Sequence, residues 1–214
     1  MKVLNLYSGI GGNRKLWQDV EVTAVEHDPK IAKIYQDFFP NDTVIVGDAH
    51  QYLLEHYKEF DFIWASPPCP THSACNYFLV GQGTIRYPDM SLYQEIIFLQ
   101  HFFEGKYCIE NVNPYYEPLI KPQYSGRHTF WANFKIPQLK VECSIGKMGP
   151  VKRLGGARSE GQNHHKLGFD LSDKSHPNKK KLLNNCVVPE IGLEILNAAR
   201  NIITERKVEL GKLF

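Results

Sequence analysis

Residues 3–12 read VLNLYSGIGG, an apolar run with strand character that ends in a glycine-rich turn. We expect a strand over residues 3–7 and a helix that follows the turn and continues to about residue 19. Further strands are predicted at 22–26, 43–46 and 62–65, and further helices at 29–39 and 49–57. Strands that are separated by single helices predict an α/β fold with an open, mostly parallel sheet and right-handed crossovers.

The second half of the chain is less regular. A long polar loop at 70–88 comes first, and loops of that length in compact domains are often functional. The elements that we expect after it are a helix at 92–103, a strand at 107–110, a β segment at 129–134 and an amphipathic helix at 189–206. Residues 137–181 show little periodicity, with strand-like residues only near 139–145. We interpret 137–181 as a small accessory region inserted in the domain.

Length and composition exclude several classes of protein. A chain of 214 residues suits one domain with a modest accessory piece. No apolar run approaches the roughly 20 residues of a membrane span, and the predicted strand at 3–7 leaves no room for a signal peptide. The five cysteines are an odd number and never form C-x-x-C, so neither a disulfide framework nor a metal site is expected. We therefore expect a cytoplasmic protein.

Positive charge is concentrated in one segment. Residues 147–181 hold nine Lys or Arg and three acidic residues, a net +6, so the rest of a chain whose total is +2 must carry −4. A basic segment on a mildly acidic body suits contact with a phosphate backbone. A solvated, loosely packed loop explains the same composition, and both interpretations stay open.

Cys69 and Glu110 carry the strongest chemical signal. Cys69 follows two prolines directly after the predicted strand at 62–65, which places it on a stiffened loop at a strand exit. Glu110 ends the next short apolar run. A thiolate attacks electron-poor carbon, and a nearby carboxylic acid can protonate the ring nitrogen that takes up the charge. The pair therefore indicates nucleophilic catalysis on a pyrimidine. The alternatives are a buried cysteine and a glutamate that pairs with a lysine or caps a turn.

Other residues at strand ends indicate a cofactor site. The glycine-rich turn follows the first strand, Glu26 closes the second, and Asp48 follows the third. Glycines let a ligand approach the backbone, while the acids suit ribose hydroxyls and an adenine amino group. Each feature alone could be a turn or a helix N-cap. Their occurrence at three successive strand ends favours an adenosine cofactor. The remaining cysteines lack such a context, and we interpret them mainly as core residues: Cys75, Cys108, Cys143 and Cys186.

Five stretches, in order along the chain, resemble motifs of the cytosine-5 DNA methyltransferase family. They are LNLYSGIGG (4–12), SPPC (66–69), ENV (110–112), GRHT (126–129) and NNCVV (184–188). The resemblance implies a Rossmann-like S-adenosylmethionine-dependent methyltransferase fold with a short, irregular target-recognition insert. It divides the chain into a catalytic, cofactor-binding domain at 1–136, a recognition region at 137–181, and a C-terminal motif and helix at 182–214.

The resemblance also implies roles for individual residues. Cys69 would attack C6 of cytosine, Glu110 would protonate or share a proton with N3, and Arg127 would hold the base oxygen. Tyr7 would stack near the adenine, and the implied cofactor-binding residues are Tyr7, Ser8, Gly9, Gly11, Gly12, Glu26, Asp48, Pro68 and Asn185. The loop at 70–88 is a candidate lid over a flipped-out base. The expected DNA contacts are Ser73 and Arg86 in that loop and Arg153, Arg158, Gln162 and Asn163 in the basic segment.

The sequence departs from the family's motifs at several positions. Pro70 stands where glutamine usually follows the cysteine, and Thr129 stands where a second arginine is common. Asn184 and Cys186 replace glycine and serine, and the recognition region is far shorter than usual. The nucleophile, the acid and the cofactor acids are all present.

Function and partners follow from this reading. We expect a DNA (cytosine-5)-methyltransferase, monomeric, that uses S-adenosyl-L-methionine on double-stranded DNA and does not bind membranes. A bacterial or phage source and a cognate restriction endonuclease, in a restriction-modification system, would fit it. The alternatives are an amino-methyltransferase acting on exocyclic nitrogen (N4 of cytosine or N6 of adenine), a non-catalytic DNA-binding or regulatory relative, and a relative that uses a modified donor or acts on RNA.

Overall fold

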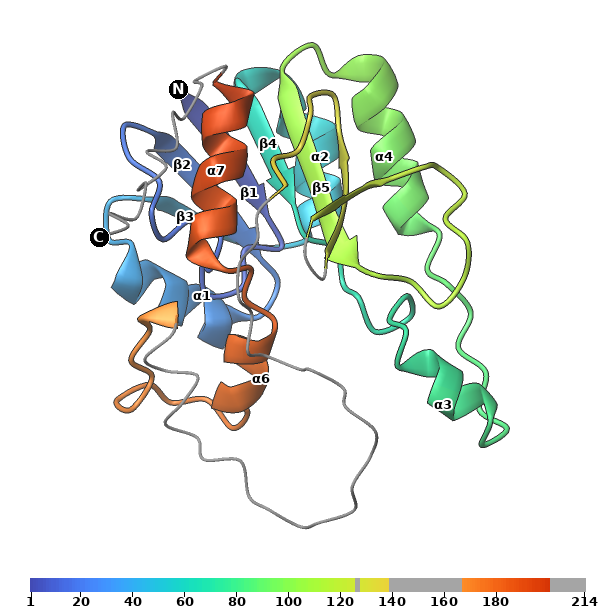
Figure 1. The fold of residues 1–214 in the computed structure, drawn as a ribbon. Coiled ribbons are helices and arrows are strands. Elements are labelled where there is room, and N and C mark those ends of the chain that lie inside the picture. Colours follow the sequence, from blue (N-terminus) through green and yellow to red (C-terminus); the bar gives the residue numbers. More distant parts are fainter. Residues whose placement is uncertain (126–127, 139–166, 201–214) are drawn as a thin grey trace, which may run out of the picture.

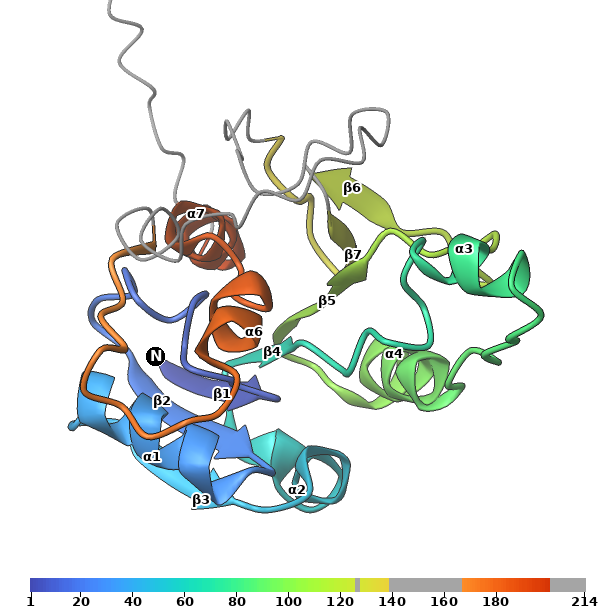
Figure 2. The same cartoon turned by 90° about the horizontal axis from the view of Figure 1, so that it is seen from below.

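The computed structural model of the chain describes residues 1–125, 128–138 and 167–200. A seven-stranded sheet runs through the described part in the order β3-β2-β1-β4-β5-β7-β6 (Figures 1 and 2). The strands are β1 (Lys2–Leu6), β2 (Glu21–Glu26), β3 (Thr43–Val46), β4 (Phe62–Ala65), β5 (Lys106–Val112), β6 (Gln123–Ser125) and β7 (His128–Ala132). The first five strands pair in parallel, and β7 pairs antiparallel with both β5 and β6. This is the predicted α/β fold with a mostly parallel sheet.

Helices cover both faces of the sheet (Figure 2). They are α1 (Pro29–Phe38), α2 (Ala49–His56), a 3₁₀ turn (Tyr57–Glu59), α3 (Asn76–Val80), α4 (Ser91–Phe102), α6 (Lys179–Asn184) and α7 (Pro189–Ala199). Successive residues of a strand point to opposite faces, so Phe62 and Trp64 join one apolar cluster with α1, α6 and α7. Ile63 and Ala65 join a second cluster with α2 and α4. The central strands are thus buried on both sides, which explains their continuous apolar runs.

The prediction of a helix between the first turn and residue 19 is wrong. Residues 12–16 form turns and residues 17–20 have no regular structure, and tertiary contacts account for this conformation. The Arg14 side chain donates to the Trp17 carbonyl (2.7 Å) and binds both carboxylate oxygens of Asp42 (2.8 and 2.9 Å). The buried Trp17 indole donates to the Gly192 carbonyl of α7 (3.0 Å). These bonds to distant residues replace the local bonds of a helix.

The other predicted elements are confirmed with small shifts of their ends. The strands at 43–46 and 62–65 have the predicted limits, and the strand predicted at 107–110 extends over 106–112. The loop at 70–88 contains the short helix α3, and the last helix is confirmed as far as residue 199. The stretch near 139–145 lies outside the described residues.

The division into three regions stays a prediction. Most of the expected recognition region, 139–166, is not among the described residues. Its following part packs on the domain, because Leu167, Phe169 and Leu171 are buried in the first apolar cluster. Among the helices of the described residues, none has the length and apolar character that a membrane crossing requires.

Candidate active site

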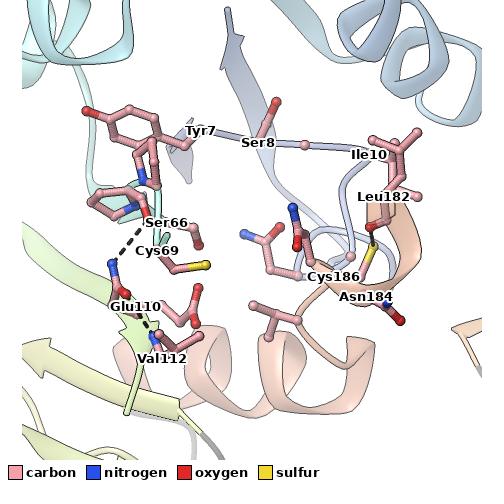
Figure 3. Close-up of a pocket in the computed structure, with 18 of the residues that line it drawn as sticks. Tyr7, Ser8, Ile10, Ser66, Cys69, Glu110, Val112, Leu182, Asn184 and Cys186 are labelled. Carbon is pink, nitrogen blue, oxygen red and sulfur yellow. Dashed lines mark hydrogen bonds between the residues drawn. The ribbon is translucent and has the colours of Figure 1, made fainter. Parts of the chain in front are cut away.

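A cavity of about 380 Å³ opens at the carboxyl ends of the parallel strands (Figure 3). Open α/β sheets bind their ligands at this edge. The loops after β1 and β4, the ends of β2 and β5, the start of β7 and the α6–α7 connection all contribute to its wall. One cavity thus receives residues from motifs that lie more than a hundred positions apart in the sequence.

Cys69 and Glu110 reach this cavity from neighbouring strands. Cys69 follows β4, is half-buried, and accepts two backbone hydrogen bonds at its carbonyl, from His72 and Ser73 (3.0 Å each). Figure 3 shows the side chains of Cys69 and Glu110 pointing into the cavity. The Asn111 side-chain amide donates to the Pro67 carbonyl (3.1 Å), so the residue next to Glu110 fixes the proline loop that carries Cys69. The predicted meeting of thiol and carboxyl in one cavity is observed.

Glu110 has a partner that sequence reasoning missed. His128 Nδ1 lies 2.5 Å from Glu110 Oε1, and both side chains are buried. Glu110 faces Phe130 across the antiparallel β5–β7 pair, so His128, two residues earlier, is its diagonal neighbour on the same face. From the sequence, the alternatives to a catalytic Glu110 were a pair with a lysine or a turn cap, and neither named a histidine. The only available signal was the place of His128 beside Arg127 in the GRHT stretch.

The same cavity is lined by most of the predicted cofactor residues. They include Tyr7, Ser8, Gly9, Gly12 and Glu26. The Glu26 carboxylate accepts from the backbone N–H of Gly9 (2.9 Å) and from that of the residue after next, at position 28 (3.0 Å). Tyr7 and Gly9 both have a φ of +55°, so the chain turns sharply as it leaves β1. The turn and the acid of two successive strands therefore lie together as predicted.

Gly12 lies against the C-terminal motif. A Cβ at this position would be 2.6 Å from the Val187 carbonyl oxygen and 2.8 Å from Cys186 Cβ. Asn184, Asn185, Cys186 and Val187 line the cavity from the α6–α7 connection. The absence of a side chain at Gly12 therefore lets the first and last motifs close the same cavity.

Just over half of the chain matches the model of a known protein family. Residues 1–114 match the sequence model of the C-5 cytosine-specific DNA methylase family. The chain belongs to this family. The matched part contains the glycine-rich turn, the Cys69 loop and the strand that carries Glu110. His128 and the NNCVV motif lie beyond it.

Several solved structures are similar to parts of this chain. A putative methyltransferase from Escherichia coli, yhhF, is 14% identical over 61% of this chain and 73% of that chain, with a TM-score of 0.43. A DNMT2 mutant from Spodoptera frugiperda is 26% identical over 52% of this chain and 35% of its own, with a TM-score of 0.36. The methyltransferase EhMeth from Entamoeba histolytica is 17% identical over 52% of this chain and 38% of that chain, with a TM-score of 0.36. No curated protein matches the chain.

Two of the residues predicted to bind the cofactor do not line the cavity. Gly11 faces the core, where a Cβ would be 2.3 Å from the Phe39 ring. Asp48 caps α2 by accepting from the backbone N–H of Gln51 (2.9 Å), so the N-cap interpretation is confirmed. The adenine contact of Asp48 stays a prediction. Pro68 and Asn185 both line the cavity.

The hydroxyl of Tyr7 is bound by the buried carboxyl group of Glu95. The hydroxyl donates to Glu95 of α4, whose other contact is with His50 Nδ1 at 3.0 Å from Oε1. Glu95 is fully buried, and its Oε2 has no hydrogen-bond partner among the residues that the structure describes. Burial raises the pKa of Glu95, and burial together with Glu95 raises the pKa of Tyr7 far above its ordinary value. Glu95 therefore fixes the ring that the family places near the adenine, a role that no local pattern indicated.

The residues predicted to contact DNA are only partly described. Ser73 and Arg86 lie in the loop after Cys69 and do not line the cavity. Arg86 is exposed, and its carbonyl accepts from the Tyr115 hydroxyl (2.7 Å), which ties the loop to the segment after β5. Five predicted residues lie outside the described part of the chain: Arg127, Arg153, Arg158, Gln162 and Asn163.

The cysteines differ from the prediction at one position. Cys108 and Cys186 are buried, as expected, and Cys143 lies outside the described residues. Cys75 is exposed, so its assignment to the core is wrong. It precedes α3, in the part of the loop that leaves the body of the domain (Figure 1), where no core is available to cover it.

Proposed function

We propose that this C-5 cytosine-specific DNA methylase is an active DNA (cytosine-5)-methyltransferase that uses S-adenosyl-L-methionine. The observation that carries the proposal is the shared cavity. Cys69, Glu110, residues of the glycine-rich turn and Glu26 all line it. A nucleophile and an acid thereby face the place where a cofactor of this family would present its methyl group.

The glycine-rich turn, Glu26 and the apolar residues near them fit an adenosine-containing cofactor. The cavity volume of about 380 Å³ is within the usual range for ligand sites. Glu26 offers carboxylate oxygens to ribose hydroxyls, and Ile10 and Ile31 offer apolar surface to a base. The sharp turn at Gly9 brings the backbone close to the ligand. S-adenosyl-L-methionine would supply an electrophilic methyl group.

In the proposed mechanism, the Cys69 thiolate attacks C6 of cytosine and forms a carbon–sulfur bond. Glu110 gives a proton to N3, or shares one with it, as negative charge builds in the ring. C5 becomes nucleophilic and would take up the methyl group that bound S-adenosyl-L-methionine supplies, which leaves S-adenosyl-L-homocysteine. Solvent water accepts the C5 proton, β-elimination breaks the bond to Cys69, and the proton on N3 returns to Glu110.

DNA binding completes the proposal. A duplex hides C5 and C6 within the stack, so the target cytosine must be flipped out at a cost of a few kcal/mol. The loop at 70–88 would close over it, with Ser73 and Arg86 at phosphate groups. Arg127 would hold the base oxygen, and the basic segment at 147–181 would contact the backbone and read bases. We expect a monomeric protein in a DNA-modification or restriction-modification role.

Covalent trapping tests the proposal. Incubation with S-adenosyl-L-methionine and DNA that contains 5-fluorocytosine should give an adduct that survives denaturation. In this analogue, fluorine at C5 replaces the proton that β-elimination must remove. Cys69→Ser is the matched control and should give none. The assignment fails if wild type gives no adduct or if Cys69→Ser gives the same one.

Product analysis separates the enzyme classes. Mass spectrometry of nucleosides from DNA treated with wild type should identify 5-methylcytosine. N4-methylcytosine or N6-methyladenine would identify an amino-methyltransferase. Absence of any transfer from labelled cofactor to DNA would favour the non-catalytic relative.

A further inference from the structure

His128 and Glu110 form a buried pair inside the cavity. The Nδ1–Oε1 distance is 2.5 Å, and the two side chains are 5% and 9% exposed. Both residues line the cavity, as Cys69 does. The contact therefore occupies one oxygen of the proposed catalytic acid and leaves the other oxygen for a ligand.

Strand pairing alone does not require this contact. The β5–β7 ladder already joins five residue pairs, from Cys108 with Ala132 to Val112 with His128. Thr129 adds side-chain bonds from its hydroxyl to the carbonyl oxygens of Asn111 (3.1 Å) and Val112 (3.0 Å). The seam between the two strands is thus secured on the other face of β7, away from the acid.

The proposed reaction demands a carboxyl group with two different oxygens. An ionised carboxylate only accepts hydrogen bonds, so the oxygen that faces N3 must hold a proton before it can give one. We propose that His128 is a positioning residue that donates its Nδ1 proton to Oε1 and so directs a protonated Oε2 toward N3 of the cytosine. This inference rests on the proposed function and assigns to that site a residue outside the matched family region.

Glu110 and solvent water close the proton balance of the step. As the Cys69–C6 bond forms, the Oε2 proton passes to N3 and Glu110 becomes a carboxylate. The Nδ1 proton of His128 stays on the ring and stabilises that carboxylate through a charge-assisted hydrogen bond. Solvent water accepts the C5 proton during β-elimination, and the proton on N3 returns to Oε2. His128 therefore ends the cycle in its starting state.

Three variants test the assignment in full-length protein. His128→Asn retains an N–H donor close to the position of Nδ1, whereas His128→Leu fills similar space with no donor. Glu110→Gln removes the group that His128 is proposed to position. Transfer from radiolabelled S-adenosyl-L-methionine to unmethylated DNA of mixed sequence gives kcat and KM, and thermal unfolding reports folding.

We expect His128→Leu to lower kcat by about 100-fold or more, because general acid catalysis contributes about that much. The KM for S-adenosyl-L-methionine should change by less than about twofold, because the proposed role of His128 is in the proton step at the base. His128→Asn should stay within about tenfold of wild type. In the Glu110→Gln background, His128→Leu should cost less than about threefold further, because contacting residues that act together are not additive.

Three results would overturn the inference. One is a His128→Leu enzyme with the kcat of wild type, and another is an equal loss with and without Glu110. The third is a His128→Asn enzyme as slow as His128→Leu while both unfold at the wild-type temperature. If wild type itself transfers no methyl group and forms no adduct, the proposed function fails and this inference fails with it.

Discussion

Replacement of Gly12 by alanine should destabilise the protein and weaken cofactor binding together. The added Cβ would be 2.6 Å from the Val187 carbonyl oxygen, whereas ordinary contact begins at 3.4 Å. That carbonyl would have to retreat by roughly 0.8 Å, the difference between the two distances. It is a backbone atom that follows the cavity-lining residues Asn185 and Cys186, so no flexible side chain can absorb the shift.

The magnitude follows from the cost of overpacking. Added methyl groups in packed sites cost about 1–3 kcal/mol. For a protein of this size, that cost lowers the melting temperature by about 2–12 °C. Thermal unfolding measures the first effect, and calorimetric titration with S-adenosyl-L-methionine measures the second, where we expect affinity to fall by at least about tenfold, or 1.4 kcal/mol.

Gly47→Ala is the matched control. Its Cβ would meet only Ile45 Cγ2 at 4.0 Å, which is ordinary contact. We expect the control to melt close to wild type, within about 0.5 kcal/mol of stability. A Gly12→Ala protein that melts with the control and binds the cofactor as wild type does would show that the first and last motifs do not approach in this way.

Three further predictions concern buried or capping acids. Asp42→Ala should cost about 3–5 kcal/mol in chemical denaturation, because it leaves the largely buried Arg14 guanidinium without its carboxylate. Glu95→Gln should be less stable to unfolding than wild type at low pH, and this difference in stability should shrink as pH rises. Burial raises the pKa of Glu95 above 4.5, so the stability from this carboxyl is present below 4.5 and is lost as pH rises through the raised pKa. Asp48→Ala should cost about 1 kcal/mol as a lost N-cap, whereas Asp48→Ser should restore the cap without restoring an adenine contact.

Each of these has a contradicting result. An Asp42→Ala protein with nearly wild-type stability would mean that Arg14 finds water or another acceptor. A melting difference between wild type and Glu95→Gln that stays constant between acid and neutral pH would remove the titration of Glu95 from the explanation. If Asp48→Ser binds S-adenosyl-L-methionine as tightly as wild type, Asp48 serves only as a cap.

The sequence predicted the sheet well because its signals are local. Apolar runs bounded by turns define β3 and β4 to the residue, and proline at the first position of α1 with Asp28 as its cap defines where that helix begins. The meeting of Cys69 and Glu110 was also predictable, because the carboxyl ends of neighbouring parallel strands share an edge.

The errors and omissions involve partners far away in the chain. Nothing near residue 14 indicates that Arg14 will bind Asp42, and this bond helps to replace the expected helix with turns. Glu95 lies 88 positions from Tyr7, on a helix whose pattern indicates only burial. His128 becomes a neighbour of Glu110 only when β7 pairs antiparallel with β5. A prediction from one sequence reaches the elements, but not these pairings between them.

The bond from Asn111 to the Pro67 carbonyl has a consequence for rate. Because Asn111 adjoins Glu110 and Pro67 lies two residues before Cys69, the proposed nucleophile and the proposed acid share a single hydrogen-bonded frame. Their relative motion is therefore restricted before any base arrives, and the entropy of aligning them is lost during folding. When a flipped cytosine binds, the remaining entropy cost is then mainly that of ordering the base itself. Variation in turnover among DNA targets should accordingly reflect the ease of extruding the base rather than the assembly of the catalytic pair.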